Sequence, residues 1–238
     1  MAGLRKKLLR GLLGRDLYSV FEESASAQRE HEYVLATMPE TLSSIGPGSI
    51  CIDCGSHKGL VSEVWLRLGA TVYAFEPNIY LFNYSRFRLA EYVQSGKFIP
   101  ECKAISTVSG YAPLYHAFGY NADSFLNRSS ESSTLIRKEE NEYKNHPQDA
   151  SNHVTVPTID FPDWIATFNQ PIDVLKMDIE GAEFDILEEL IVTGTYKNIY
   201  CILVETHDHV IEKIKDKGER VRQLIRDYEI RNIRLDWQ

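Results

Sequence analysis

The chain has 238 residues, 43% of them hydrophobic and 25% charged, which is enough for one large globular domain with its own core. Its formal net charge of −8 would repel a phosphate backbone, so nucleic acid is excluded as the first choice of partner. No apolar run reaches the roughly 20 residues that cross a bilayer. The four cysteines lack the spacing of a secreted disulfide framework, which favours a soluble, cytoplasmic protein.

Residues 1–45 are predicted to form an N-terminal helical segment ahead of the main domain, residues 46–238. Within residues 1–15, leucines recur at helical spacing on one face, and the charged side chains are all Lys or Arg. This basic amphipathic helix could make a peripheral contact with an anionic membrane. It could equally dock on its own domain or on a second copy of the chain in a homo-oligomer.

From residue 50 onward, short β-branched runs alternate with helical patterns. Strands are predicted at 50–53, 71–75, 97–100, 154–160, 171–180 and 198–205, and helices at 60–68, 79–93, 182–190 and 208–228. Such alternation is typical of βαβ units around a buried parallel sheet. Between them, residues 105–126 are rich in aromatics that could form a core or an acceptor-binding wall. The polar stretch 127–152 is too long for an ordinary connection and reads as an insertion or lid.

The segment "CIDCGSHKG", residues 51–59, raises three alternatives. A structural zinc site would need four ligands, and neither Cys102 nor Cys201 has a partner at suitable spacing. A redox pair would start a helix, whereas Cys51 falls inside a predicted strand. The third alternative is a glycine loop that ends a strand, opens a helix and holds a cofactor, and this one fits best.

The spacing in this loop differs from the GxGxxG of dinucleotide-binding proteins, and Asp53 occupies the place where a pyrophosphate would lie. A cationic cofactor group therefore fits better beside Asp53. The next strand ends at Glu76, where an acidic side chain can accept both ribose hydroxyls. A ribose without a pyrophosphate, together with an ammonium group, describes S-adenosyl-L-methionine (SAM).

The segments "IDCGSHKG", "VYAFEPN", "VPTID", "IDVLKMDIEGAEFDIL" and "ILVE" together resemble the FkbM family of SAM-dependent methyltransferases. The resemblance implies an α/β, Rossmann-like class I methyltransferase fold and O-methylation of hydroxyls on sugars, glycans or small natural products. It also implies a SAM site formed by the loop residues Asp53, Gly55, Ser56, His57 and Gly59, the ribose ligand Glu76, the adenine-side residues Pro77, Asn78, Lys103 and Ala104, and Asp178 facing the methyl group. The family usually has other residues at Ser56 and His57. The C-terminal "IRNIRLDWQ" is too short for a final antiparallel strand pair, so that edge should be abbreviated or completed by a partner.

Methyl transfer to a hydroxyl needs the acceptor oxygen near the methyl carbon and a group that removes its proton. We expect Asp178, Glu180 and His207 at the carboxyl end of the sheet to be catalytic. His207 could be the base, oriented by Asp178 or Glu205. Alternatively, Asp178 and Glu205 could bind a divalent cation that acidifies the hydroxyl. Two other roles remain open, namely a catalytically silent SAM- or nucleotide-binding module and a membrane-associated scaffold.

Overall fold

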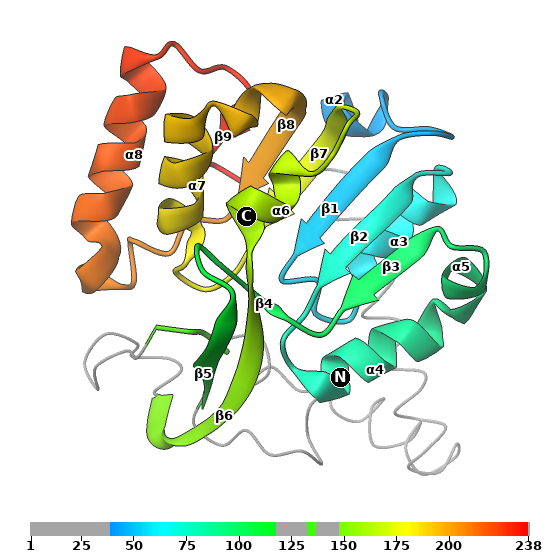
Figure 1. Cartoon of the computed structure of the whole chain (residues 1–238), viewed down its shortest axis with the longest axis horizontal. Helices are drawn as coiled ribbons and strands as arrows, with labels where there is room; N and C mark the ends of the chain where they lie inside the picture. The colour runs from blue at the N-terminus through cyan, green and yellow to red at the C-terminus, as the bar shows by residue number, and fades with distance from the viewer. Residues whose placement is uncertain (1–38, 118–132, 137–147, 238) are drawn as a thin grey trace, which may run out of the picture.

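A computed structural model describes residues 39–117, 133–136 and 148–237. Its centre is a six-stranded sheet in the order β3-β2-β1-β7-β8-β9, and all neighbouring strands run parallel (Figure 1). The strands are β1 (Ile50–Cys54), β2 (Thr71–Phe75), β3 (Phe98–Glu101), β7 (Ile172–Met177), β8 (Ile199–Val204) and β9 (Ile233–Arg234). This order confirms the predicted α/β, Rossmann-like class I arrangement.

Helices cover both faces of the sheet. The helices after β1 and β2 are α3 (Leu60–Arg67), α4 (Ile79–Arg88) and α5 (Ala90–Gln94), and later in the chain come α6 (Phe161–Ala166), α7 (Glu183–Thr193) and α8 (Lys215–Asp227). A short helix, α2 (Pro39–Leu42), precedes β1, and two 3₁₀ turns, η3 (Thr195–Asn198) and η4 (Glu212–Ile214), flank β8. Helices α7 and α8 pack side by side (Figure 1).

Two hydrophobic clusters lie on opposite sides of the main sheet, and a third, small one belongs to the strands of a smaller sheet described below. Alternation along β1 assigns Ile52 and Cys54 to the cluster with α6, α7 and α8, and Cys51 to the cluster with α3. Trp65 of α3 is completely buried in the second cluster. Because the strands are buried on both faces, their sequences are nearly continuous apolar runs, which is typical of parallel sheets.

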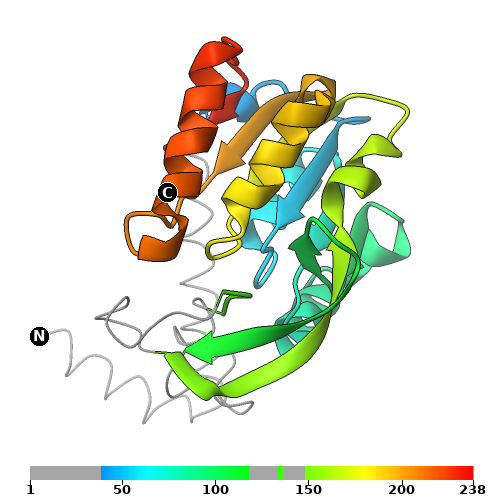
Figure 2. The same cartoon turned by 60° about the vertical axis from the view of Figure 1, so that its left-hand side comes forward.

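A second, smaller sheet was not predicted. It contains β4 (Ala104–Ser106), β5 (Gly110–Ala117) and β6 (Gln148–Asp160) in the order β4-β6-β5, with β5 and β6 antiparallel. Figure 2 shows β5 and β6 as a long curved ribbon that extends from the main body. Since residues 148–152 belong to β6, the predicted insertion ends earlier than residue 152. Thr134, which lies inside it, pairs with Tyr115 of β5 in an isolated bridge.

Three further differences concern helix and sheet ends. The predicted helix 79–93 is interrupted at Leu89, which separates α4 from α5. The predicted helix 208–228 starts only at Lys215, after η4. Towards the C-terminus, β9 adds one short parallel strand beside β8 and forms the last strand of the sheet among the described residues. An abbreviated edge and an edge completed by a partner both remain predictions.

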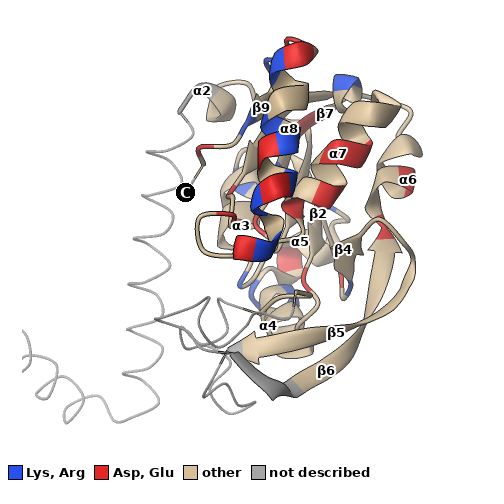
Figure 3. Cartoon of the chain, turned by 90° about the vertical axis from the view of Figure 1, so that its left-hand side faces the viewer, with Lys and Arg blue, Asp and Glu red and all other residues tan. Residues whose placement is uncertain are grey.

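Charges are distributed unevenly over these elements. In Figure 3 acidic segments lie on α7 and both acidic and basic segments lie on α8, while the visible parts of β5 and β6 are mostly uncharged. Within the described part of the chain, no helix combines the length and apolar character needed to span a bilayer. The predicted basic helix 1–15, and most of the segment 1–45, lie outside the described residues.

Candidate functional site

A pocket opens where β1, β2 and β7 end. Its empty space amounts to about 750 Å³ when the open solvent at its mouth is included. The adjoining strand ends are tied together by backbone hydrogen bonds, such as Gly55 N–H to Phe75 O and Asp178 N–H to Cys54 O. In open α/β sheets ligands bind at this edge. The pocket is lined by Gly55, His57, Phe75, Glu76, Pro77, Lys103, Ala104, Ile105, Leu114, Ser133, Thr134, Leu135, Asp178, Ile179, Glu180 and Ala182.

Gly55 allows the loop after β1 to approach the loop after β7. Its φ is +74°, and a Cβ atom at this position would lie 1.8 Å from the carbonyl oxygen of Asp178. No other residue fits there without moving backbone. Because of this close approach, the carboxyl ends of β1 and β7 lie together at the base of the pocket. A ligand could then bind over both ends.

Glu76 links this loop to the end of β2. Its Oε2 accepts the His57 N–H at 2.9 Å, and its Oε1 accepts the Asn78 N–H at 2.8 Å. Burial raises the pKa of Glu76 to about 7, although these two backbone donors and the charge of Lys176 oppose the rise. The predicted loop and the predicted ribose ligand are therefore in direct contact, and each carboxylate oxygen keeps a second acceptor position.

The other predicted cofactor residues divide into two groups. His57, Pro77, Lys103 and Ala104 line the pocket, and burial lowers the pKa of His57 to about 3, so its imidazole is neutral. Three further predicted residues do not line the pocket but hold the backbone of the loops beside it. They are Ser56, Gly59 and Asn78. Gly59, with φ +73°, precedes α3, and a Cβ atom there would lie 3.2 Å from Leu89 Cδ1. The Asn78 side chain caps α4 by accepting the Tyr80 N–H. Ser56 is buried in the loop, where its N–H donates to Phe75 O.

Asp53 does not have the predicted role at the pocket surface. It is completely buried in β1, directly beside Lys176 of β7, and their Oδ1 and Nζ atoms lie 3.4 Å apart. Ser62 donates to its other oxygen at 2.6 Å. The argument that Asp53 repels a pyrophosphate and attracts an ammonium group was wrong, because Lys176 offsets this charge inside the protein.

Lys176 was missed by the sequence analysis, although a lysine inside the apolar run "DVLKMD" was a usable signal. Its Nζ donates to Gly55 O at 2.9 Å and lies 3.6 Å from Asp178 Oδ2. Burial alone would lower the pKa of Lys176, but the charges of Asp178 and Asp53 outweigh it and raise that pKa above its usual value. A buried, charged lysine therefore fixes the glycine loop and one oxygen of Asp178.

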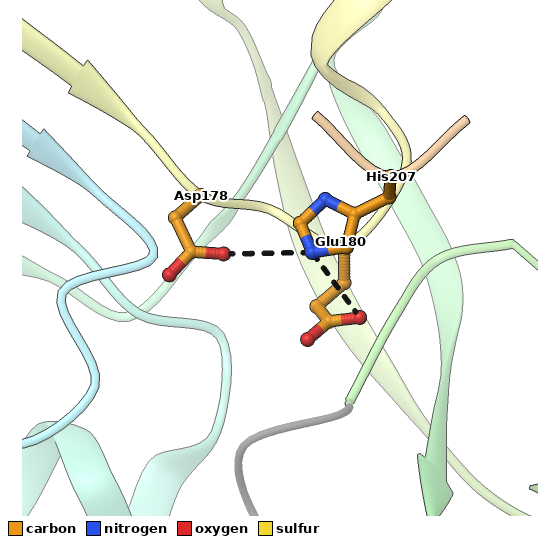
Figure 4. Close-up of side chains that lie close together, drawn as sticks. All are labelled: Asp178, Glu180 and His207. Atoms are coloured by element: carbon orange, nitrogen blue, oxygen red, sulfur yellow. Dashed lines mark ion pairs between the residues drawn. The ribbon is translucent and has the colours of Figure 1, made fainter. Parts of the chain in front are cut away.

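The three predicted catalytic residues converge. The ligand atoms of Asp178, Glu180 and His207 all lie within 4.8 Å of one another (Figure 4). His207 Nε2 is 3.9 Å from Asp178 Oδ1 and 3.7 Å from Glu180 Oε2. Asp178 and Glu180 line the pocket directly, whereas the His207 side chain is only 5% exposed and lies beside them.

The orientation of His207 is set by Glu183, and not by Asp178 or Glu205 as predicted. Glu183 Oε1 lies 2.9 Å from His207 Nδ1 and accepts the N–H groups of Ile179 and Gly181. It is completely buried at the start of α7. Its sequence signal was ambiguous because a glutamate there also suits a helix N-terminus.

Carboxylates dominate the electrostatics of this cluster. Burial would lower the pKa of His207, but the hydrogen bond and charge of Glu183, with Glu180 and Asp178, raise it to about 9. Burial, followed by the charge of Asp178, raises the pKa of Glu205 to about 7. Without another cation His207 is therefore protonated at neutral pH, which argues against its predicted role as a free base.

The predicted aromatic wall is absent from the described part of the pocket. Tyr111 is 80% exposed, and neither it nor Tyr115 contributes to the lining, which β5 supplies through Leu114. Phe118, Tyr120 and Phe125 lie outside the described residues. Ser133, Thr134 and Leu135, which were assigned to a polar lid, complete the pocket instead.

Comparison with known proteins agrees with this arrangement. A family model described as the methyltransferase FkbM domain matches residues 53–231, well over half of the chain. The chain belongs to the FkbM methyltransferase family. A search of curated proteins and a search of solved structures each gave no significant match. The FkbM match begins at Asp53 and includes His207, so it spans the whole candidate site and makes methyl transfer the class of reaction.

Proposed function

We propose that this FkbM protein is a SAM-dependent O-methyltransferase that acts on a hydroxyl of a sugar, a glycan or a small natural product. The observation that carries the proposal is the contact between the glycine loop and Glu76 at the edge of a pocket. A buried carboxylate with spare acceptor positions, beside a loop that only glycine permits, suits a ribose lying between β1 and β2.

SAM fits the residues around this contact. Glu76 would accept the ribose hydroxyls, while Pro77, Lys103 and Ala104 lie on the side where the adenine would rest. Asp53 is enclosed beneath the loop, so its carboxylate does not contact the ammonium group. Asp178 lines the pocket and adjoins Gly55, where it would face the methyl group of SAM, as the family resemblance implies.

When bound, SAM supplies an electrophilic methyl group on a positively charged sulfur, and the acceptor oxygen replaces the sulfur on that carbon. The acceptor hydroxyl must be held about 3–3.5 Å from the methyl carbon. Asp178 and Glu180 are the pocket carboxylates that can orient this hydroxyl and receive its proton. Protonated His207, hydrogen-bonded to Glu183, lies beside these two carboxylates and offsets part of their negative charge.

An uncharged, hydroxyl-bearing acceptor fits the remaining lining. Ser133 and Thr134 add hydroxyl groups, and Ile105, Leu114 and Leu135 add apolar surface. β5 contains no Asp, Glu, Lys or Arg. Such a mixture suits the polar edges and apolar faces of a sugar or polyketide-like ring better than a phosphate backbone. A peripheral membrane contact through residues 1–15, a homo-oligomer and a cytoplasmic location remain predictions.

The test is production of S-adenosylhomocysteine from SAM in the presence of sugar and natural-product hydroxyl acceptors, with mass detection of the methylated product. Asp178→Ala should remain folded, because the Asp178 side chain is 30% exposed, yet lose at least ~100-fold in turnover. Full turnover by that variant would refute the assigned role. Tight SAM binding without turnover on any acceptor class would instead support the catalytically silent module.

A further inference from the structure

Three possible metal ligands converge at the pocket from separate turns of the chain. Asp178 follows β7, Glu180 lies in the turn before α7, and His207 follows β8. We propose that they bind one divalent cation that accepts mixed nitrogen and oxygen ligands, such as Mn²⁺, and that this cation holds the acceptor hydroxyl (Figure 4). This inference rests on the proposed function, which it extends by naming how the hydroxyl is activated.

The orientation of the imidazole ring is the first argument. Glu183 Oε1 already accepts two backbone N–H groups, so it acts as an acceptor towards His207 Nδ1 as well. Nδ1 therefore carries a proton, and this N–H donates a hydrogen bond to Glu183. Nε2 then points between the two pocket carboxylates, on a side chain that is 95% buried. A carboxylate that orients a histidine in this way is the usual outer partner of a metal-bound imidazole.

The distances are the second argument. Ligand atoms bonded to one small divalent cation at about 2.1–2.2 Å stand roughly 3.0–3.5 Å from one another. His207 Nε2 lies 3.9 Å from Asp178 Oδ1 and 3.7 Å from Glu180 Oε2, and all three ligand atoms lie within 4.8 Å of one another. Rotation of the two carboxylate side chains towards His207 Nε2 would bring the three ligand atoms to bonding distance of one cation. Lys176 lies against the other oxygen, Asp178 Oδ2, at 3.6 Å, which leaves Oδ1 for the cation.

Charge is the third argument. The carboxylates of Asp178, Glu180 and Glu183 surround His207, and Lys176 is the lysine that contacts this group. A divalent cation between them would offset the excess negative charge. Three protein ligands also leave coordination positions for oxygen atoms of the acceptor. With Asp178 and Glu180 bound to the cation, the hydroxyl would release its proton to solvent and not to these carboxylates, because a hydroxyl bound to the cation would have a lowered pKa. Its oxygen would then attack the methyl carbon.

The experiment is a titration of the full chain with Mn²⁺, in which the electron paramagnetic resonance signal of the free ion reports binding. We expect one Mn²⁺ per chain. Asp178→Asn and His207→Gln should each weaken binding at least ~10-fold, because each alters a direct ligand. Glu183→Gln should weaken it by about 10- to 100-fold, because it alters the outer partner that orients the His207 ring. The matched control is His209→Gln, an exposed histidine two residues from His207, which should bind Mn²⁺ unchanged.

Circular dichroism of every variant checks folding. Should His207→Gln fail to fold, the partly exposed Asp178→Asn still decides the question. Lack of Mn²⁺ binding to the unmodified chain at millimolar concentration, or unchanged binding to folded Asp178→Asn, would overturn the inference. A parallel titration with SAM separates the two proposals. SAM binding without Mn²⁺ binding overturns only the metal site, and Mn²⁺ binding without SAM binding overturns only the proposed function.

Discussion

Replacing Glu76 with glutamine tests the energetic cost of the proposed ribose ligand. Burial raises the pKa of Glu76 from 4.5 to about 7, so folding favours the protonated carboxyl. Stability from this group is fully present below pH 4.5 and is lost as the pH rises through 7. The free energy of unfolding should therefore fall by ~3 kcal/mol in total as the pH rises, because each unit of difference between the two pKa values contributes about 1.36 kcal/mol. Glutamine is uncharged at every pH, although its amide nitrogen cannot accept one of the two backbone N–H groups that Glu76 accepts, which adds a cost that does not depend on pH.

The assay is urea unfolding of the native chain and of Glu76→Gln between pH 5 and pH 8. The stability of the variant relative to the native chain should rise by ~2.5 kcal/mol from pH 5 to pH 8, because the remainder of the change lies below pH 5. The variant should also lose about 10- to 100-fold in SAM affinity, because a charge-assisted hydrogen bond is replaced by a neutral one. Glu91→Gln, on the exposed surface of α5, controls for general charge effects. A stability difference that stays constant from pH 5 to pH 8 would refute the reasoning.

Three other perturbations test the site. Gly55→Ala should lower the free energy of unfolding by at least ~3 kcal/mol. Gly96, with φ +71° and open space around it, is the control, and Gly96→Ala should lower it by about 1 kcal/mol. Equal losses would show that the close approach of Gly55 to Asp178 O is unimportant. Lys176→Met should lower the free energy of unfolding, measured by chemical denaturation, by about 3–5 kcal/mol, because it leaves Asp53 buried without its cation. Adding Asp53→Asn should recover part of this loss, and no recovery would contradict the pairing. SAM affinity, measured by titration, should fall up to tenfold per pH unit below pH 7 as Glu76 is protonated, and a flat profile from pH 6 to pH 8 would contradict its role as ribose ligand.

The central sheet could be predicted from the sequence because its strands are short, β-branched and separated by helical patterns. The predicted strand 71–75 agrees with β2 in both bounds, and 97–100 differs from β3 by one residue at each end. The break at Leu89 carries no local signal, since neither glycine nor proline lies in residues 79–93. The start of α8 was misplaced because Asp208 pairs with Arg222 through the fold, a contact that no local pattern reveals.

The second sheet could not be predicted for a different reason. β5 has the sequence "GYAPLYHA", which contains proline, and its partner β6 is separated from it by 30 residues of polar and mixed sequence. Pairing over such a distance depends on tertiary contacts that a single sequence does not show. The pocket residues Leu114 and Thr134 were missed with it, because their position depends on this sheet.

At the site, residue types at strand ends were predictable, but their partners were not. Glu76, Asp178 and Glu180 lie at the pocket, as their positions after β2 and β7 indicated. Asp53 stands two residues earlier in the strand register than Glu76 and Asp178, inside the sheet, where its side chain meets Lys176. A shift of two residues at a strand end thus separates a pocket carboxylate from a buried ion pair.

The most direct test of the account is isothermal titration of SAM into the purified chain and into Glu76→Gln, with ATP and NAD as comparison ligands. The account predicts one SAM per native chain, binding at least tenfold weaker to the variant, and no comparable binding of ATP or NAD. Absence of SAM binding to the native chain, or equal affinity of the native chain and a folded Glu76→Gln variant, would contradict it.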